Sequence, residues 1–314
     1  MDDADKRPTI LIVAGPTAVG KSGVGMAVAR ALGGEIISAD SAAVFQGLDI
    51  GTAKPPLADQ KAIPHHGLDV VKPTASFSVA DFQKLAEYAV SDILARGRLP
   101  IIVGGTGLWI RALVRGYDLP QQAGPSPLRI RIHDAAERDN FQSLRRQLSV
   151  VDSASFRAID PHDHRRLVRA MEVFMTTGRP LHRSSGGAAP YRAVYWVLTR
   201  NVHELHARIA QRVQLMLEAG LAAEAMNLIR AGVRPGSQSL SAIGYREMVD
   251  WIYGRTTEAE RDALIVKHTQ QLAKRQLTWF RGEPEARWLD LSAWPMQAAV
   301  AKIAGSLSLA GKDL

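Results

Sequence analysis

The chain has 314 residues, a formal net charge of +8, 46% hydrophobic and 22% charged residues, and no cysteine. This composition is typical of a globular protein with a sizeable core, and it excludes disulfides, thiolate metal sites and a disordered chain. No apolar run approaches the roughly 20 residues of a membrane span, and no secretory signal is visible, so we expect a cytoplasmic protein that does not enter a membrane.

Residues 15–22, GPTAVGKS, match the phosphate-binding pattern G-x-x-x-x-G-K-[ST] at every required position. They follow the apolar run 9–13 and open a helical segment over 21–32, which is the strand-to-helix setting that the pattern requires. The predicted phosphate-binding residues are Gly15, Pro16, Thr17, Ala18, Val19, Gly20, Lys21 and Ser22. Lys21 can reach the outer phosphate and the Ser22 hydroxyl can hold Mg²⁺. The pattern indicates a diphosphate without specifying ATP, and an ordinary glycine-rich turn is the alternative.

A second short strand is predicted over 35–38, and Asp40 follows it. The carboxyl ends of parallel strands face the ligand crevice, so we expect Asp40 to lie beside whatever the phosphate loop holds. Residues 45–56 and 64–69 are predicted to form loops around this site. Ser78, with an aspartate three residues on, predicts the start of a helix that ends near residue 96.

A third apolar strand, 99–103, runs directly into Gly104, Gly105, Thr106 and Gly107. A nucleotide-hydrolysing P-loop protein usually carries a Walker B aspartate at this position, so its absence counts against an ATPase or GTPase, although nucleotide kinases tolerate it. We interpret the glycines as bringing backbone close to a ligand beside the Thr106 hydroxyl. A tight turn with a capping threonine is the alternative.

Residues 118–192 differ in composition, with twelve arginines, eight acidic residues and no lysine. Arginine suits bidentate phosphate contacts and base stacking, which favours a nucleic-acid partner, and a solvated charged surface is the alternative. Helices are predicted at 125–139, 141–150 and 163–177. The apolar positions of the third helix bury one face and leave Arg165, Arg166 and Arg169 elsewhere on it. Residues 184–190 are predicted to be the hinge by which this segment rejoins the core.

A fourth strand is predicted at 193–198, followed by a helix that starts at Asn201. This helix carries Arg208 and Arg212 four residues apart, on one face, where two cations suit a diphosphate; exposed surface arginines are the alternative. A long helix is predicted from Thr257 to residue 281. The sequence therefore predicts an α/β fold, with a P-loop parallel-sheet core formed by residues 1–117 and 193–314 and an inserted all-helical domain at 118–192.

The chain resembles the tRNA dimethylallyltransferase (tRNA isopentenyltransferase) family from residue 15 to about residue 290. The matching stretches are GPTAVGKS (15–22), DSAAVFQGLDIGTAKP (40–55), PHHGLD (64–69), FSVADF (77–82), GGTGLW (104–109), DHRRLVRAMEV (163–173), AIGYRE (242–247) and QLAKRQLTWFRG (271–282). Many enzymes share the first stretch, whereas the second, in this order with the others, is specific. The resemblance implies transfer of a dimethylallyl group from dimethylallyl diphosphate to the exocyclic N6 amine of adenosine 37, just 3′ of the tRNA anticodon.

The resemblance also implies roles for individual residues. Asp40 would be the general base and Thr106 a hydroxyl partner beside the reacting amine, and the phosphate loop would bind the prenyl diphosphate instead of ATP. The implied tRNA contacts are Asp40, Ser41, Ala42, Ala43, Thr106, Arg165, Arg166, Leu167, Val168, Arg169, Gly244, Tyr245 and Arg246. An Mg²⁺ ligand is the alternative role for Asp40. Family members often have glutamine where Arg165 stands, which leaves details of the tRNA contact open.

The expected partners are the tRNA anticodon stem-loop, dimethylallyl diphosphate and Mg²⁺, with the protein acting as a monomer of the bacterial type. Three other functions remain open at this point: an adenylate isopentenyltransferase acting on free nucleotides, a P-loop nucleotide kinase, and a non-enzymatic RNA-binding module. The arginine-rich insertion favours a polymeric acceptor over a free nucleotide, and the phosphate loop has no use in a module that only binds RNA.

Overall fold

The computed structural model describes residues 6–119, 126–178, 180 and 188–308. The chain forms two compact units, one made of residues 1–115 and 189–314 and the other of residues 116–188. The sequence predicts these boundaries two and four residues further along the chain, at 118 and 192. Most of the predicted hinge at 184–190 lies outside the described residues.

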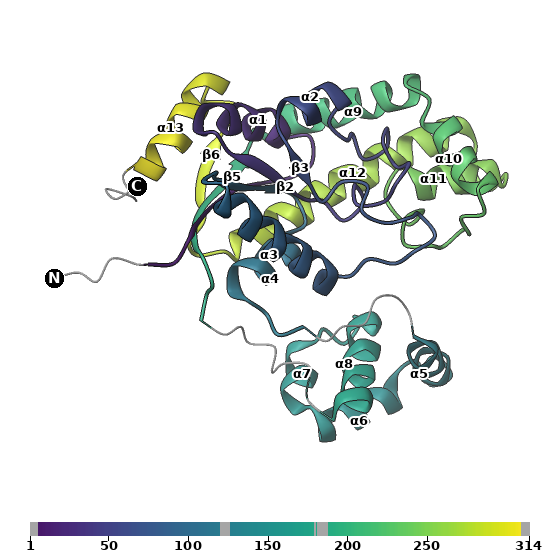
Figure 1. The fold of residues 1–314 in the computed structure, drawn as a ribbon. Helices are drawn as coiled ribbons and strands as arrows, with labels where there is room; N and C mark the ends of the chain where they lie inside the picture. The colour runs from purple at the N-terminus through teal and green to yellow at the C-terminus, as the bar shows by residue number, and fades with distance from the viewer. Residues whose placement is uncertain (1–5, 120–125, 179, 181–187, 309–314) are drawn as a thin grey trace. The chain divides into compact units, whose positions relative to one another are not determined.

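A six-stranded parallel sheet forms the centre of the first unit, in the order β3-β2-β4-β1-β5-β6 (Figure 1). The strands are β1 (Thr9–Ala14), β2 (Glu35–Ala39), β3 (His65–His66), β4 (Pro100–Gly104), β5 (Arg192–Thr199) and β6 (Arg287–Asp290). The predicted α/β class is thereby confirmed. The prediction of a loop over 64–69 is wrong at two residues, because β3 adds a short edge to β2 through the pairs Ile36↔His65 and Ile37↔His66.

Helices cover both faces of this sheet. Those of the first unit are α1 (Lys21–Leu32), α2 (Leu57–Ala62), α3 (Val79–Ala95), α4 (Gly107–Arg115), α9 (Val202–Glu218), α10 (Leu221–Arg230), α11 (Tyr245–Ile252), α12 (Glu258–Arg281) and α13 (Met296–Ser308). Alternate residues of β1 face opposite ways, so Ile12 packs with α3 and α4 while Leu11 packs with α1 and α13. In Figure 1, α1 and α13 lie above the sheet and α3 and α4 lie below it.

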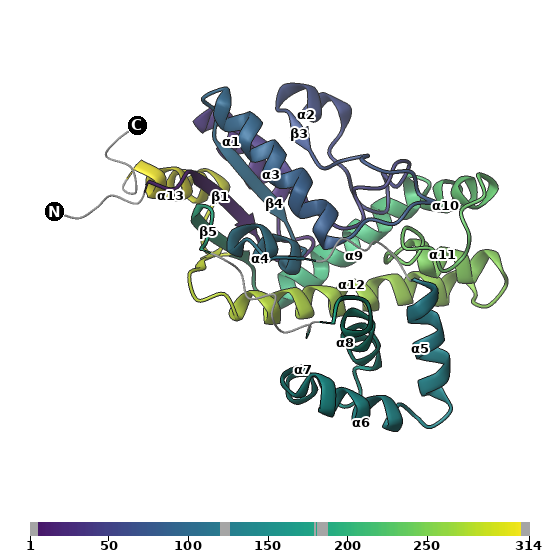
Figure 2. The same ribbon diagram turned by 60° about the horizontal axis from the view of Figure 1, so that its bottom comes forward.

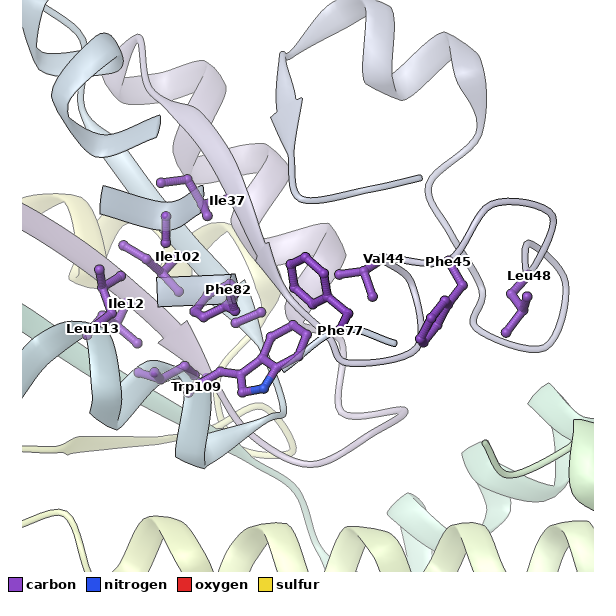
Figure 3. Packing of buried hydrophobic residues seen from close by; sticks show 14 of the residues in the cluster. Ile12, Ile37, Val44, Phe45, Leu48, Phe77, Phe82, Ile102, Trp109 and Leu113 are labelled. Atoms are coloured by element: carbon purple, nitrogen blue, oxygen red, sulfur yellow. The ribbon is translucent and has the colours of Figure 1, made fainter. Parts of the chain in front are cut away.

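The cluster on the α3 and α4 side is rich in aromatic residues (Figure 3). The Trp109 ring of α4 stacks on Phe82 of α3 at 4.5 Å between centroids and lies 5.6 Å from Phe77. Phe45 and Leu48 extend this cluster into the loop that follows β2. Burial of these side chains ties the loop to the sheet.

The helix starts follow the sequence signals. Ser78 caps α3 in a reciprocal capping box with Asp81, as predicted. Thr257 caps α12 in the same way with Glu260, which fixes the start of the long helix that crosses Figure 2. Where the phosphate loop meets α1, Gly20 has φ 112°, a conformation that favours glycine.

The second unit is helical, as predicted, and consists of α5 (Pro127–Glu137), α6 (Gln142–Val151), α7 (Ser153–Ala158) and α8 (His164–Thr177). Its centre includes the fully buried carboxylate of Glu172, which accepts hydrogen bonds from Ser126, Arg129 and Arg169. Burial alone would raise the pKa of Glu172, but these hydrogen bonds hold it below its usual value. Two of the twelve arginines of this segment are thus structural.

We expect Gly104→Ala to destabilise the protein by about 3 kcal/mol, because β2 and β4 leave no room for a side chain there. A Cβ atom on Gly104 would lie 2.2 Å from the carbonyl oxygen of Ala39 and 2.6 Å from its Cβ atom. Urea unfolding measures the change. The matched control is Gly305→Ala in α13, where nothing lies within 4 Å of the added carbon. Equal stability of the two variants would contradict this packing argument.

Candidate active site

The phosphate loop joins β1 to α1 at the carboxyl edge of the sheet. Gly15 has φ 146°, and a Cβ atom there would lie 2.5 Å from the carbonyl oxygen of Leu198 on β5, so the loop requires glycine at this point. Two loop carbonyl oxygens accept hydrogen bonds from cationic side chains. Lys21 Nζ donates to Pro16 O at 2.7 Å and Arg208 Nε donates to Ala18 O at 2.9 Å. The loop is therefore held in shape by the same positive charges that an anion would contact.

Two partly buried cations and one carboxylate meet beside this loop. Burial and the nearby Arg212 guanidinium lower the pKa of Lys21 to about 7, although Asp40 opposes the shift. Burial also lowers the pKa of Arg212, again against the effect of Asp40. Arg212 Nη2 donates to Thr52 O at 3.2 Å, which holds the guanidinium at the site. Because uncompensated positive charge is costly to bury, this arrangement favours an anionic ligand.

A cavity of about 240 Å³ opens over the phosphate loop. Lys21, Ser22, Arg208 and Arg212 are among its lining residues. The predicted pairing of the two arginines on one face of α9 with the phosphate loop is therefore seen in the structure. We call this space the donor cavity.

Asp40 and Thr106 lie together, as their positions after β2 and β4 predict. Asp40 Oδ1 accepts the N–H groups of Ala42 at 2.9 Å and Ala43 at 3.3 Å. Thr106 Oγ1 accepts the N–H of Ser41 at 3.2 Å, so the two loops are joined. Within the described part of the chain, Asp40 Oδ2 accepts no hydrogen bond, which makes it the candidate proton acceptor.

Both residues line a larger cavity of about 710 Å³, which we call the acceptor cavity. Its other lining residues include Arg212, Gly244, Arg246 and His268. A third space of about 130 Å³ shares lining residues with both cavities: Lys21 and Ser22 with the donor cavity, Asp40 with the acceptor cavity, and Arg212 with both. One edge of the sheet can therefore hold an anion and a second, larger molecule side by side.

Ser22 and Asp40 both line this 130 Å³ space, and they supply a hydroxyl and a carboxylate oxygen. Mg²⁺ prefers oxygen ligands and is usually held by one or two protein groups, with water and substrate phosphates completing its shell. The residues present therefore fit an Mg²⁺ ion that is brought in with a diphosphate.

Four of the predicted RNA contacts are buried, and the prediction is wrong for their side chains. Leu167 and Val168 belong to the core of the second unit, and Ala43 is buried beside Asp40. The Tyr245 hydroxyl donates to Glu224 at 2.6 Å and accepts the Gly51 N–H at 3.1 Å. Leu167 and Val168 are buried because the apolar stripe of α8 faces the core of its unit, while Ala43 and Tyr245 are held in the interior of the first unit.

The remaining predicted RNA contacts differ in their surroundings. Ser41, Ala42, Gly244 and Arg246 line the acceptor cavity. In the second unit Arg165 is exposed, and Arg166 is exposed beside Asp163 at 3.3 Å. Arg169 instead donates to the buried Glu172, so Arg165 and Arg166 are the two predicted arginines of α8 that are exposed.

Sequence reasoning missed Gln276, His268 and the backbone of Thr52 at this site. Gln276 stands in the matching stretch 271–282 and Thr52 in the stretch 40–55, and these were the signals available for them. His268 Nδ1 lies 2.7 Å from the buried carboxylate of Glu247, which also accepts from Arg246. This contact joins α11 to α12, and no spacing along the chain predicts it.

No helix among the described residues is long and apolar enough to cross a bilayer. This finding agrees with the absence of a long apolar run in the sequence.

Comparisons with known proteins agree on one relationship. The family model for IPP transferase matches residues 43–283. The chain is 42% identical over 305 residues to the tRNA dimethylallyltransferase of Desulforudis audaxviator strain MP104C, covering 96% of this chain and 98% of that protein. It is 43% identical over 288 residues to tRNA dimethylallyltransferase 1 of Pelobacter propionicus, covering 90% of this chain and 93% of that protein.

Solved structures give the same result. The full-length tRNA isopentenylpyrophosphate transferase of Bacillus halodurans matches with a TM-score of 0.73 and 37% identity, covering 98% of this chain and 99% of that one. A eukaryotic dimethylallyltransferase acting on tRNA matches with a TM-score of 0.80 and 25% identity, covering 96% of this chain and 79% of that one.

Proposed function

Because the chain belongs to the IPP transferase family, we propose that it moves a dimethylallyl group from dimethylallyl diphosphate to the N6 amine of adenosine 37 in tRNA. The chain is an enzyme of the tRNA-prenylating class, as its relatives over nearly its whole length are. One observation supports the assignment of substrates to cavities: Asp40 and Thr106 line the acceptor cavity while Lys21 and Arg208 line the donor cavity, and Arg212 lines both.

The acceptor amine needs help to react, because its lone pair is delocalised into the adenine ring. In our proposal Asp40 Oδ2 takes the amine proton, and the Thr106 hydroxyl, beside the Ser41 N–H, holds the amine in place. General base catalysis of this kind contributes typically 10²–10⁴-fold.

The departing diphosphate gathers negative charge on the other side of the allylic carbon. Lys21, Arg208, Arg212 and the loop N–H groups would stabilise that charge where it develops. Mg²⁺ held by Ser22, with Asp40 as a second candidate ligand, would neutralise part of the same charge when bound. Because water competes for an allylic carbon with cationic character, the acceptor base must fill its cavity for transfer to succeed.

The activity is tested by incubating the protein with dimethylallyl diphosphate and unmodified tRNA, followed by nucleoside analysis. We expect N6-dimethylallyladenosine at position 37 and release of diphosphate. Parallel reactions with AMP as acceptor and with ATP alone distinguish the other candidates. Preferential prenylation of AMP, or hydrolysis of ATP without prenyl transfer, would contradict the proposal. Monomeric state and cytoplasmic location stay predictions.

We further propose that the second unit binds the tRNA anticodon stem through phosphate contacts from Arg165 and Arg166. Replacing both by glutamine should weaken tRNA binding and lower the slope of log K against log salt concentration by about 1 for each arginine–phosphate pair removed. Arg169 stays in place, because its removal would leave the buried Glu172 short of a partner.

The matched control removes the same charge from the first unit, with Arg30→Gln and Arg230→Gln at exposed ends of α1 and α10. Affinity is measured by filter binding between about 50 and 200 mM salt. If the α8 double variant and the control double variant give the same slope of log K against log salt concentration, the proposed role of Arg165 and Arg166 is wrong.

A further inference from the structure

One side chain connects the loop of the donor cavity to the loop of the acceptor cavity. Gln276 Oε1 accepts the N–H of Thr17 in the phosphate loop at 2.8 Å. Its Nε2 atom donates to the carbonyl oxygen of Gly105 at 3.0 Å, one residue before Thr106. A single amide group on α12 therefore spans the two halves of the site.

The position of Gln276 agrees with these contacts. It lines both the acceptor cavity and the 130 Å³ space beside Lys21 and Asp40. Leu272, four residues earlier on the same helix, lines both spaces as well. This face of α12 thus forms the boundary where the two substrates of the proposed reaction would meet.

The glycines after β4 are explained by the same face of α12. A Cβ atom on Gly105 would lie 2.3 Å from Gln276 Nε2. A Cβ atom on Gly107 would lie 2.1 Å from the Trp279 ring, three residues further along the helix. The Gly104 to Gly107 stretch therefore lets α12 rest on the backbone of the acceptor loop, and the Gln276 amide can reach across it.

The chemistry of the contact suits an amide. One end of the side chain must accept a hydrogen bond and the other must donate one. A glutamate at this position can still accept the Thr17 N–H. Its second carboxylate oxygen, however, would face the carbonyl oxygen of Gly105, and two acceptors cannot form a hydrogen bond. Methionine has nearly the same length and makes neither strong bond. These two replacements separate the linkage from simple filling of space.

We propose that Gln276 is a positioning residue that sets the separation between the allylic carbon of the donor and the amine of the acceptor. The inference rests on the proposed function, because it assumes a donor on the phosphate loop and an acceptor base at Asp40 and Thr106. Transfer between two bound molecules is sensitive to their alignment, and a misplacement of about 1 Å can cost about 10²-fold in rate. A link between the two loops therefore acts on the rate of transfer more than on the binding of either substrate.

The test compares Gln276→Met with the wild-type protein in single-turnover prenyl transfer to tRNA. We expect the rate with saturating substrates to fall about 10- to 100-fold, while the dissociation constants of dimethylallyl diphosphate and of tRNA each change less than about threefold. Gln276→Glu should also lower the rate of transfer. Gly105→Ala should reproduce the loss with Gln276 intact, because the added carbon displaces the amide. Gln270→Met, on the same helix and outside both cavities, is the matched control.

Transfer by Gln276→Met at the wild-type rate would overturn the inference, as would a normal rate in Gly105→Ala. Loss of affinity for one substrate in proportion to the loss of rate would also overturn it, since Gln276 would then be a binding residue. If Gln276→Met fails to fold, as urea unfolding would show, Gly105→Ala and Gln276→Glu decide the question. A wild-type protein that does not prenylate tRNA would refute the proposed function itself, which is a different outcome from an active wild type with active variants.

Discussion

Asp40→Asn is expected to lower the rate of prenyl transfer by about 10²–10⁴-fold with little change in the affinity for either substrate. The asparagine side chain retains an Oδ1 atom that can accept the N–H groups of Ala42 and Ala43, so the turn after β2 is preserved. It lacks the negative charge and basicity that removal of the amine proton requires. Single-turnover transfer with saturating donor and tRNA measures the effect.

Asp59→Asn in α2 is the control for loss of a partly exposed carboxylate. It should transfer at the wild-type rate. An Asp40→Asn variant that also transfers near the wild-type rate would show that proton removal does not depend on this carboxylate. The Thr106 hydroxyl and solvent water would then be the groups to test.

Lys21→Met is expected to lower the rate by about 10²–10³-fold, because it removes a partly buried cation from the place where diphosphate charge develops. It also removes the hydrogen bond to Pro16 O that shapes the loop. Donor affinity should fall together with the rate, in contrast to Asp40→Asn. Equilibrium binding of dimethylallyl diphosphate and single-turnover transfer separate the two effects. Unchanged donor binding would place the diphosphate elsewhere.

The pH dependence of donor binding gives a further check on Lys21. Burial, with Arg212 as the second cause, lowers its pKa to about 7, so the free enzyme loses this charge as pH rises through 7. Diphosphate favours the charged form, so binding takes up a proton above that pH and the dissociation constant should rise toward about tenfold per pH unit. In Lys21→Met the dissociation constant of the donor should not show this rise with pH. Equal pH profiles of donor binding for the wild type and Lys21→Met between pH 7 and 9 would contradict a diphosphate contact by the charged Lys21.

The same pKa has a consequence for stability. In the unfolded chain the Lys21 pKa is about 10.4, so between pH 7 and that value the unfolded state binds more protons than the folded one. Folding stability of the unliganded wild type should therefore rise with pH across this window, relative to Lys21→Met. Below pH 7 Lys21 is charged in both the folded and the unfolded state, so burial of the charged ammonium group lowers the folding stability by its full amount.

Local signals predicted most of the elements around the site. The helix over 21–32 and the strands before Asp40 and Thr106 follow from apolar runs bounded by glycine and capping residues, and the structure agrees to within one or two residues. Because parallel strands end at one edge, Asp40 and Thr106 could be placed together before any contact was known. Local sequence could not show that Tyr245 is buried, because its partner Glu224 stands twenty-one residues earlier.

The contacts that complete the site are all long-range. Gln276 reaches Thr17 across 259 positions, and Arg212 reaches the Thr52 carbonyl across 160. Hydrogen bonds between distant segments leave no period or spacing in the sequence, so neither pairing could be predicted from it. The two-residue β3 is missed for a related reason, because it is too short to show alternation and exists only through its pairing with β2.

The pairing of β1 bears on how the protein is made. β1 lies between β4 and β5, and its register with β5 runs from Thr9↔Arg192 to Ala14↔Val197. A ribosome releases the amino-terminal half of the chain first. The edge of β1 that pairs with β5 therefore has no partner strand until about residue 199 has emerged. The four helices of the second unit lie within residues 127–177, so all of them have emerged before β5, and local helical contacts of this kind form quickly. We therefore expect the arginine-bearing second unit to fold before the catalytic sheet is complete.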